Sequence, residues 1–412
     1  MRKTANPVAR SAGSDATETR VAAREVACSL AAGLSVRPDA LFVFGSFHHR
    51  AMFSDAIDML RAELHPAHVL GATVGNTILD DHETEHTAGF CALAVSMPGT
   101  VIEPFRFDLE DGPPSVWSAG FIAERVALPG SVTGAAGPLP HRGMIMLTDP
   151  FSVNATQVCA ALDAAAGPTG ARIHGGVASG ASLPGLNVLA CDRRTSHAGV
   201  VGLSIFGDIQ LDGFASQGCQ PVGAPMVVTK ASGTRILEIG GRKALEVLAD
   251  MADALPLLER ERLQAGLLVG IAVHAGKARL GRGDFIVRPA ISIEPEHSAI
   301  VLPEPVAVGS TMQFQVRDPD IAGEDLSMLL DREQVRGPAV GALLFSCTAR
   351  GPRLFAEPSH DASMLSRRLA VPIAGCRCAG EFAVIEGRSL VHNHSATGVV
   401  FRPVDDHSPP RG

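Results

Sequence analysis

Apolar runs and amphipathic segments follow one another in the same order three times along the chain. The first series begins with a continuous apolar run at residues 40–44, which is typical of a buried strand. Residues 53–64 follow, with large apolar side chains recurring at the spacing of one helix face. Apolar runs at residues 69–75 and 89–95 complete the series as strands, each next to small residues that favour a turn.

The same series returns twice more. The elements of the later copies are, in order, a strand, a helix and two strands at residues 144–147, 154–165, 173–180 and 199–206, and again at 342–345, 361–369, 372–381 and 397–401. Each match is short, but a shared order of elements predicts an internal repeat.

The predicted fold class is α/β (mixed α+β), with repeated β-α-β-β units, mixed sheets flanked by helices, and two lobes. A chain of 412 residues is too long for one ordinary core, and loop residues near 230–242 place the boundary there. We therefore expect a disordered tail at residues 1–16, an N-terminal lobe at 17–235, a C-terminal lobe at 236–402 and a disordered tail at 403–412.

Composition and charge narrow the range of functions. The net charge is −8 and aromatic residues make up 4 %, so the chain lacks the basic stripe and stacking platform of a nucleic-acid-binding protein. No apolar run has the length of a membrane-spanning helix or a signal peptide. The eight cysteines are scattered through apolar runs, which is typical of reduced thiols. We expect a cytoplasmic protein that binds neither nucleic acid nor membrane.

Six strings in the second half of the chain are more specific than this patterning. They are Gln217-Gly-Cys-Gln-Pro-Val-Gly223 with Val228-Thr229, Gly283-Asp-Phe-Ile-Val-Arg288, Val316-Arg-Asp318 with Glu324-Asp-Leu326, Gly341-Ala-Leu-Leu-Phe-Ser-Cys-Thr-Ala-Arg-Gly351, Gly375-Cys-Arg-Cys-Ala-Gly-Glu381, and His394-Ser-Ala-Thr397. Together and in this order they closely resemble the FIST domain, over roughly residues 40–402.

The resemblance implies a sensory module with N-terminal and C-terminal halves, which correspond to the two expected lobes. Such domains are expected to bind small ligands, amino acids and related metabolites among them, and some bacterial members are similar haem-binding nitric-oxide sensors. The chain leaves no room for a kinase, receiver, cyclase or F-box domain, so we expect it to signal through a separate protein. It also carries Cys376 and Arg377 where family members commonly have two phenylalanines after the glycine.

Three charged residues are candidates for binding an amino acid. Arg288 and Arg317 each follow an apolar strand, and a guanidinium group can bind a carboxylate through two hydrogen bonds. Glu381 follows a strand and turn and could receive a ligand ammonium group. The structural alternatives are an ion pair of Arg317 with Glu381 or Asp318, and a bond from Glu381 to turn N–H groups.

The predicted ligand-binding set is completed by Cys347, Arg350, Cys376, Arg377 and His394, which belong to the third repeat. The two earlier copies lack the first four of these residues, and Glu381, at the corresponding places. The third copy is therefore where we expect ligand specificity.

Metal, haem and covalent chemistry are alternatives with weaker signals. Cys376-x-Cys378 and His392-x-His394 lack the usual spacing of a zinc motif, so no metal is predicted. Haem ligation by a histidine such as His394 stays open, although no Cys-x-x-Cys-His string is present and no cofactor is predicted. Cys347 has no visible base, so we predict no catalytic residue and no enzyme.

The sequence thus predicts a non-enzymatic sensory protein whose ligand is an amino acid or related carboxylate metabolite. A haem-based nitric-oxide sensor and a protein–protein adaptor are the alternatives.

Overall fold

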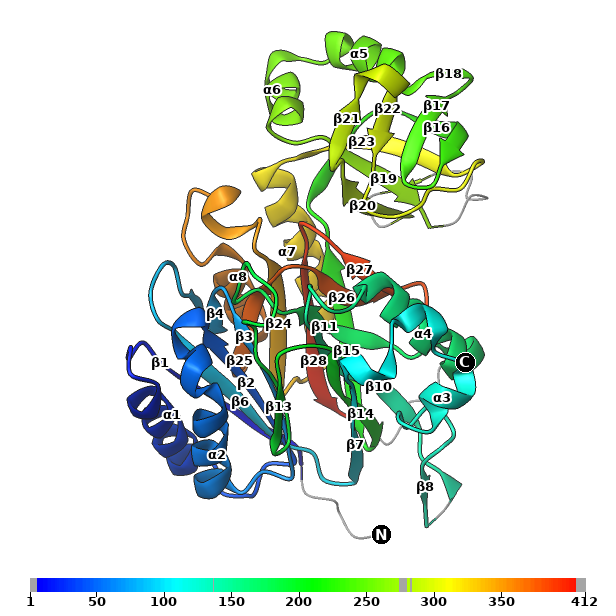
Figure 1. Ribbon diagram of the computed structural model, residues 1–412. Coiled ribbons are helices and arrows are strands. Elements are labelled where there is room, and N and C mark those ends of the chain that lie inside the picture. Colours follow the sequence, from blue (N-terminus) through cyan, green and yellow to red (C-terminus); the bar gives the residue numbers. More distant parts are fainter. Residues whose placement is uncertain (1–5, 136, 274–279, 282–283, 405–412) are drawn as a thin grey trace. The chain divides into compact units, whose positions relative to one another are not determined.

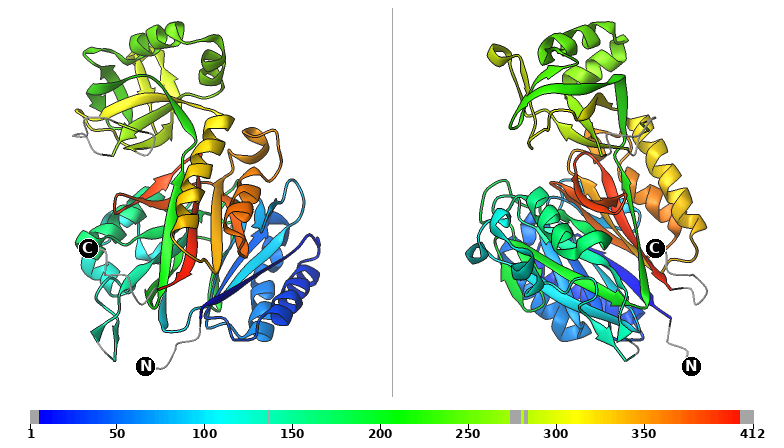
Figure 2. Two further views of the ribbon diagram at one scale, coloured as in Figure 1. Left: turned by 180° about the vertical axis from the view of Figure 1, so that it is seen from behind. Right: turned by 90° about the vertical axis from the view of Figure 1, so that its right-hand side faces the viewer.

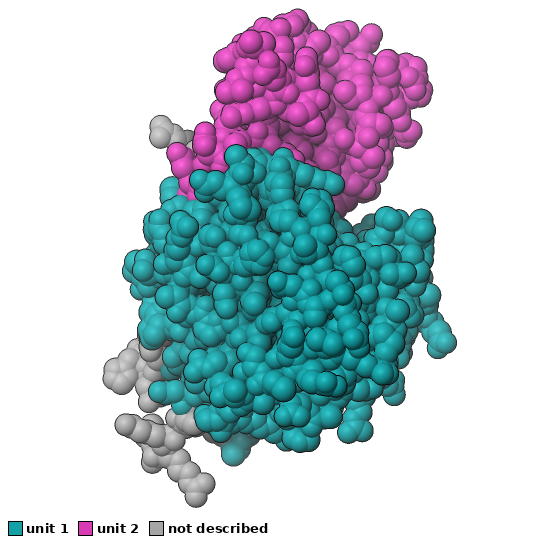
Figure 3. All heavy atoms as spheres, turned by 90° about the vertical axis from the view of Figure 1, so that its left-hand side faces the viewer, with its two compact units in different colours: residues 1–215, 327–391, 395–412 teal, residues 216–326, 392–394 magenta. Residues whose placement is uncertain are grey.

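The structure is a computed structural model that describes residues 6–135, 137–273, 280–281 and 284–404 (Figure 1). It divides into two compact units (Figure 3). Unit 1 comprises residues 1–215, 327–391 and 395–412, and unit 2 comprises residues 216–326 and 392–394. These units are not the two consecutive lobes expected from the sequence, because the chain leaves unit 1 after Ala215 and re-enters it at Ser327.

The internal repeat is the framework of unit 1. In the first copy, β2 (Ala40–Ser46) pairs in parallel with β3 (His68–Val74) across helix α2 (Phe53–Leu64), and antiparallel with β6 (Phe90–Ser96). The later copies show the same pairing in β10 (His141–Thr148), α4 (Ala155–Ala166), β11 (Ile173–Val177) and β14 (Val200–Gly207), and in β24 (Gly341–Cys347), α8 (His360–Leu369), β25 (Ile373–Cys378) and β28 (Ala396–Pro403). The predicted fold class of mixed sheets flanked by helices is confirmed.

The three repeats exchange hairpins, which the sequence did not predict. Two short strands follow the second strand of each copy: β4 (Thr77–Leu79) and β5 (His82–Glu83), β12 (Leu189–Cys191) and β13 (Arg194–Ser196), and β26 (Glu381–Ile385) and β27 (Arg388–His392). Each hairpin joins the sheet of a different copy. The hairpin of the first copy pairs with β25, that of the second with β3, and that of the third with β11. The three six-stranded sheets are therefore linked in a cycle.

One strand that precedes each copy along the chain completes the opposite edge of its sheet. These edge strands are β1 (Val8–Ser14), β7 (Thr100–Phe107) and β15 (Ile209–Ser216). The expectation of a disordered tail at residues 1–16 is wrong for β1, which pairs antiparallel with β6 along its whole length. Residues 1–5 and 405–412 of the two expected tails lie outside the described residues.

The hairpins are fastened by side-chain hydrogen bonds to the backbone of the sheet they join. Asp80 accepts from the N–H of Ile373 at 3.0 Å, and Asp192 accepts from the N–H of Val69 at 3.0 Å. At the third junction the Ser389 hydroxyl takes this place, accepting from the Ile173 N–H at 3.1 Å. Each bond satisfies a backbone donor within the first two residues of a parallel strand, which would otherwise be costly to bury.

The three sheets share one apolar core, which contains matching side chains from every repeat. Phe44, Leu147 and Phe345 lie in it from the first strands of the three copies. Helices cover the outer faces: α1 (Thr19–Gly33) and α2 pack on the first sheet, and α3 (Ala119–Ala123) and α4 on the second (Figures 1 and 2). The arrangement buries both faces of the central strands, which explains their continuous apolar sequences.

Unit 2 is built around one sheet that runs β20-β19-β23-β16-β17-β22-β21, with β18 beside β17. Its elements are β16 (Cys219–Ser232), β17 (Arg235–Ile239), β18 (Arg242–Lys243), α5 (Ala244–Ala254), α6 (Leu257–Ala265), β19 (Leu268–Ala272), β20 (Phe285–Pro289), β21 (Ser292–Glu294), β22 (Ala299–Val301) and β23 (Thr311–Arg317). Helix α7 (Pro319–Val335) follows. Across the described part of the chain, no helix has both the length and the apolar character needed to cross a bilayer.

A glycine in the second strand of each repeat allows the parallel strands to approach closely. A Cβ atom at Gly175 would lie 1.9 Å from the carbonyl oxygen of Met146, and one at Gly375 would lie 1.9 Å from that of Leu344. Gly175 also has φ of +133°, a conformation that side chains disfavour. These glycines are therefore required within strands, whereas their sequence context suggests only turns.

We predict that Gly175→Ala destabilises the protein by at least about 2 kcal/mol, because the clash is with backbone and cannot be relieved by a rotamer change. Thermal unfolding followed by circular dichroism measures the effect. Gly120→Ala is the matched control, since its Cβ would meet only the Ser118 hydroxyl at 3.9 Å, and it should change stability by less than about 1 kcal/mol. Equal melting temperatures for the two variants would contradict the packing described.

Candidate functional site

The predicted residues of the third repeat form a buried polar cluster where β24 and β25 end. Arg350 is completely buried and binds Asp361 of α8 through two hydrogen bonds, from Nε at 2.7 Å and from Nη2 at 2.8 Å. Burial by itself would raise the pKa of Asp361, but the Arg350 guanidinium holds that pKa well below its usual range. Arg350 therefore serves as the partner of a buried carboxylate.

Arg377 forms a second buried ion pair, and this one joins two repeats. It donates to Glu83 from Nε at 2.9 Å and from Nη2 at 2.7 Å, and its Nη2 also lies 2.6 Å from Glu85. Glu83 belongs to β5 of the exchanged hairpin, so the ion pair fixes that hairpin against β25. Gly351 leaves the space for this guanidinium, because a Cβ there would lie 2.1 Å from Nη2.

Glu381 is a buried carboxyl group at the start of β26. It accepts a hydrogen bond from the Ser395 hydroxyl at 2.7 Å. Burial raises its pKa to about 8, and the hydrogen bonds from Ser395 and Cys347 reduce this rise only in part. Where the hairpin of the third repeat pairs with the second sheet, Glu381 lies opposite Gly176. The equivalent residue in the hairpin of the second repeat is Leu189, which lies opposite Ala72 of the first sheet. At neutral pH the group is mostly protonated, which makes it a poor receptor for an ammonium ion.

The cysteines of the cluster are buried. Cys376 and Cys378 face the common core from β25, with their sulfur atoms 3.4 Å apart. Burial and the adjacent Cys376 raise the pKa of Cys378 well above its ordinary value. A thiol becomes a nucleophile only as the thiolate, so this environment disfavours covalent chemistry at Cys378. Cys347 is likewise buried and contacts the Glu381 carboxyl group.

The remaining predicted site residues belong to unit 2. Arg288 is buried in β20, and its Nε lies 2.7 Å from a carboxylate oxygen of Glu304. Arg317 ends β23, and the neighbouring Asp318 pairs with Arg262. His394 has a left-handed φ of +61° just before β28. None of the predicted residues lines a cavity described here.

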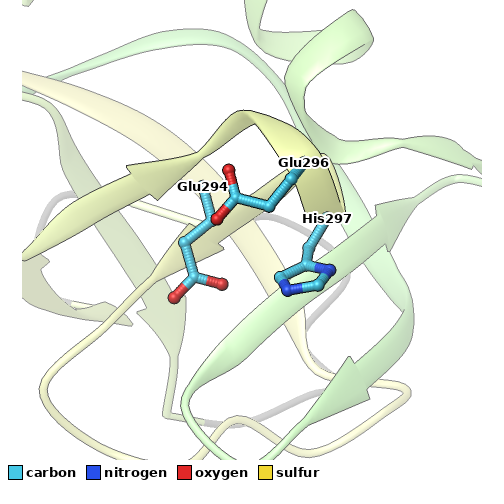
Figure 4. A group of neighbouring side chains, drawn as sticks. All are labelled: Glu294, Glu296 and His297. Carbon is cyan, nitrogen blue, oxygen red and sulfur yellow. The ribbon is translucent and has the colours of Figure 1, made fainter.

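A group of metal-binding residue types occurs on the surface of unit 2. Among the described residues, Glu294, Glu296 and His297 are the group of three whose ligand atoms converge (Figure 4). Both oxygens of Glu294 are already bound by Arg235, from Nε at 2.7 Å and from Nη2 at 3.0 Å. The pair uses the carboxylate that a cation would need, so this group supports no metal site.

One cavity of unit 1 is lined by arginines that the sequence did not single out. It has a volume of about 740 Å³, within the range of small-molecule sites. We call it the arginine cavity, and its lining residues are Arg61, Ala67, Pro104, Phe105, Arg106, Asp108, Asp111, Arg125, Cys191, Asp192, Arg193 and Arg194. They come from the end of α2, from β7 and the segment after it, and from the turn of the exchanged β12–β13 hairpin.

Positive charge exceeds negative charge in the arginine cavity, with five arginines against three aspartates. Two of the carboxylates have arginine partners nearby: Asp108 pairs with Arg106, and Asp111 lies 3.2 Å from Arg125. Within the described residues, Arg193 and Arg194 make no ion pair. Two guanidinium groups are thus left to attract an anion.

The third aspartate, Asp192, is held mainly by the sheet. It is only partly buried, and it accepts from Val69 N–H and contacts His68 Nδ1 at 3.2 Å. These hydrogen bonds outweigh burial and lower its pKa. Arg61 lies 3.9 Å from Asp192, and its buried Nη1 has no hydrogen-bond partner in the described structure. A buried donor without an acceptor is costly, and a ligand oxygen would satisfy it.

The sequence contained one signal for this cavity, the adjacent Arg193 and Arg194 between two short strands. The other arginines are far apart along the chain, at positions 61, 106 and 125, and none belongs to a motif. Only the exchange of the β12–β13 hairpin brings them together.

Comparison with known proteins gives matches over almost the whole chain. A family model for the FIST N domain matches residues 39–242, and one for the FIST C domain matches residues 244–384. An uncharacterized protein of Mycobacterium tuberculosis is 32 % identical over 392 residues, which cover 94 % of this chain and 98 % of the relative. An uncharacterized protein of Mycobacterium bovis is 32 % identical over 373 residues, 90 % of this chain and 91 % of the relative.

We predict that Glu381→Gln makes stability less dependent on pH. The pKa of Glu381 is raised from 4.5 to about 8 in the folded protein. Its favourable contribution to the free energy of unfolding is therefore fully present below pH 4.5 and is lost as the pH rises through 8. The variant should therefore melt a few degrees above the wild type at pH 8.5 and show little gain at pH 5, as measured by thermal unfolding. The exposed Glu63→Gln should follow the wild type at both pH values. A constant difference between wild type and Glu381→Gln would contradict the raised pKa.

Proposed function

Because the chain belongs to the FIST domain family, we propose that it is a sensory protein that binds a small anionic metabolite in the arginine cavity. The observation that carries the proposal is the uncompensated positive charge of this cavity in a chain of net charge −8. A cleft of one sign concentrates ligands of the opposite sign. Carboxylate metabolites, amino acids among them, are the ligand class that this chemistry favours.

The arginines suit reversible recognition. A guanidinium group stays charged at every physiological pH and presents paired donors that match a carboxylate or phosphate. Pro104 and Ala67 in the same lining offer apolar surface for the carbon atoms of a ligand. Polar groups that set orientation within a partly apolar cavity are the usual composition of a ligand site.

We propose a non-enzymatic role with signal output through a separate partner protein. The thiol of Cys378 supports the first part, since burial raises its pKa and disfavours the nucleophilic thiolate. All eight cysteines are free, which supports a reducing compartment such as the cytoplasm. Arg288, Arg317 and Glu381, suggested by the sequence as ligand contacts, are not part of this proposal because the cavity is lined by other residues.

We predict that isothermal titration against amino acids, mono- and dicarboxylates and phosphates yields at least one ligand, and that Arg194→Ala weakens its binding about tenfold. Loss of one charged hydrogen bond costs roughly 1.5–3 kcal/mol, which corresponds to this factor or more. Arg24→Ala is the matched control: it removes the same charge from an exposed position in unit 1 outside the cavity. An identical affinity in the wild type and in Arg194→Ala would refute the assignment of the site.

A further inference from the structure

A second cavity adjoins the arginine cavity in unit 1. It has a volume of about 530 Å³ and is lined by Arg37, Asp58, Arg61, Ala62, His65, Pro66 and Arg193. Arg61 and Arg193 line both cavities. The two hollows are therefore neighbouring parts of one groove, with shared guanidinium groups at their junction.

The second cavity is also positively charged. Three arginines face one carboxylate, Asp58. Arg37 is tied to the chain by one hydrogen bond, from its Nε to the carbonyl oxygen of His65 at 2.5 Å. A guanidinium carries five donors, so this bond fixes the position of Arg37 and leaves its outer nitrogens to bind an anion.

A continuous stretch of chain forms the floor between the two positive ends. Ala62 and Pro66 line the second cavity and Ala67 lines the first, while Arg61 at the end of α2 lines both. The segment 61–67 therefore passes from one cavity to the other, and it contributes three small apolar side chains and the imidazole of His65 to the lining. The side chains of Ala62, Pro66 and Ala67 give a short hydrocarbon segment apolar surface to contact between the charged ends.

From this arrangement we infer that the ligand is a dianion with two terminal acidic groups joined by a short aliphatic chain, as in an α,ω-dicarboxylate. One acidic group binds in the arginine cavity, near Arg194 and Arg106. The other binds in the second cavity at Arg37, and Arg61 and Arg193 lie between them. This deepens the proposed function and rests on it, since it specifies the ligand class of the same site.

The advantage of a dianion is that the second contact is made without a second loss of translational freedom. Two weak anion contacts linked in one molecule bind much more tightly than either alone, provided that the linker matches the spacing of the sites. Affinity should therefore pass through a maximum as the chain length of the dicarboxylate increases.

The test compares dicarboxylates of four to eight carbons with monocarboxylates of the same length by isothermal titration with the full chain. We expect the best dicarboxylate to bind at least tenfold more tightly than its monocarboxylate. Arg37→Ala should remove this advantage and leave monocarboxylate affinity unchanged, whereas Arg194→Ala should weaken both. Arg24→Ala should behave as the wild type, and all variants should keep the wild-type melting temperature.

The outcomes separate the two proposals. Equal affinities for the two series, or an unchanged dicarboxylate affinity in Arg37→Ala, would overturn the dianion inference while anion binding still supported the proposed function. If no carboxylate binds, and phosphate and pyrophosphate do not bind either, the proposed function is overturned as well. Tight binding of pyrophosphate, with no binding of dicarboxylates, would support an anion site but overturn the inference that the ligand has an aliphatic linker.

Discussion

The pairing of each short hairpin with the sheet of another repeat is the constraint on which the structure of unit 1 depends. A β-α-β unit with one antiparallel neighbour leaves the outer edge of its second strand unpaired, and open edges of this kind expose backbone donors and acceptors. In unit 1 that edge is filled in all three copies, by β4, β12 and β26. Because the hairpins pass around a cycle, no repeat can complete its sheet without the others.

This exchange also explains the buried charges. Arg377 and Glu83 come from different repeats, and their ion pair lies where the first hairpin joins the third sheet. Removing one partner of such a pair would leave an uncompensated buried charge, which costs several kcal/mol. The polar cluster of the third repeat thus mainly stabilises the junction between repeats, although its residues are of the types found in binding sites.

The arginine cavity depends on the same exchange at another junction. The β12–β13 hairpin of the second repeat lies beside β3 of the first, with Asp192 bonded to Val69 at the start of that strand. Its turn thereby carries Arg193 and Arg194 to Arg61 of α2. The excess of positive charge arises because this junction brings five arginines together with three aspartates, and Asp192, which the sheet also binds, lies 3.9 Å from Arg61.

Local sequence patterns predicted a large part of this protein. Apolar periodicity is a property of single elements, so strands such as β2 and β24 and helix α2 could be identified from residues close together in the chain. The repeat followed from their order, and the FIST resemblance from short strings. Prediction failed for β1, whose polar sequence is that of an edge strand. The partners of Arg350 and Arg377 could not be read from the sequence, because Asp361 and Glu83 are not adjacent to them in the chain.

The sequence by itself therefore determined the elements, their threefold order and the family. Only the tertiary structure decided which hairpin joins which sheet, that residues 216–326 form a unit of their own, and which cavity has more arginines than aspartates in its lining. The physical reason is that strand pairing uses backbone hydrogen bonds, which carry little trace in side-chain sequence. The net charge of a cavity, in turn, depends on which arginines and carboxylates the fold brings together from distant parts of the chain.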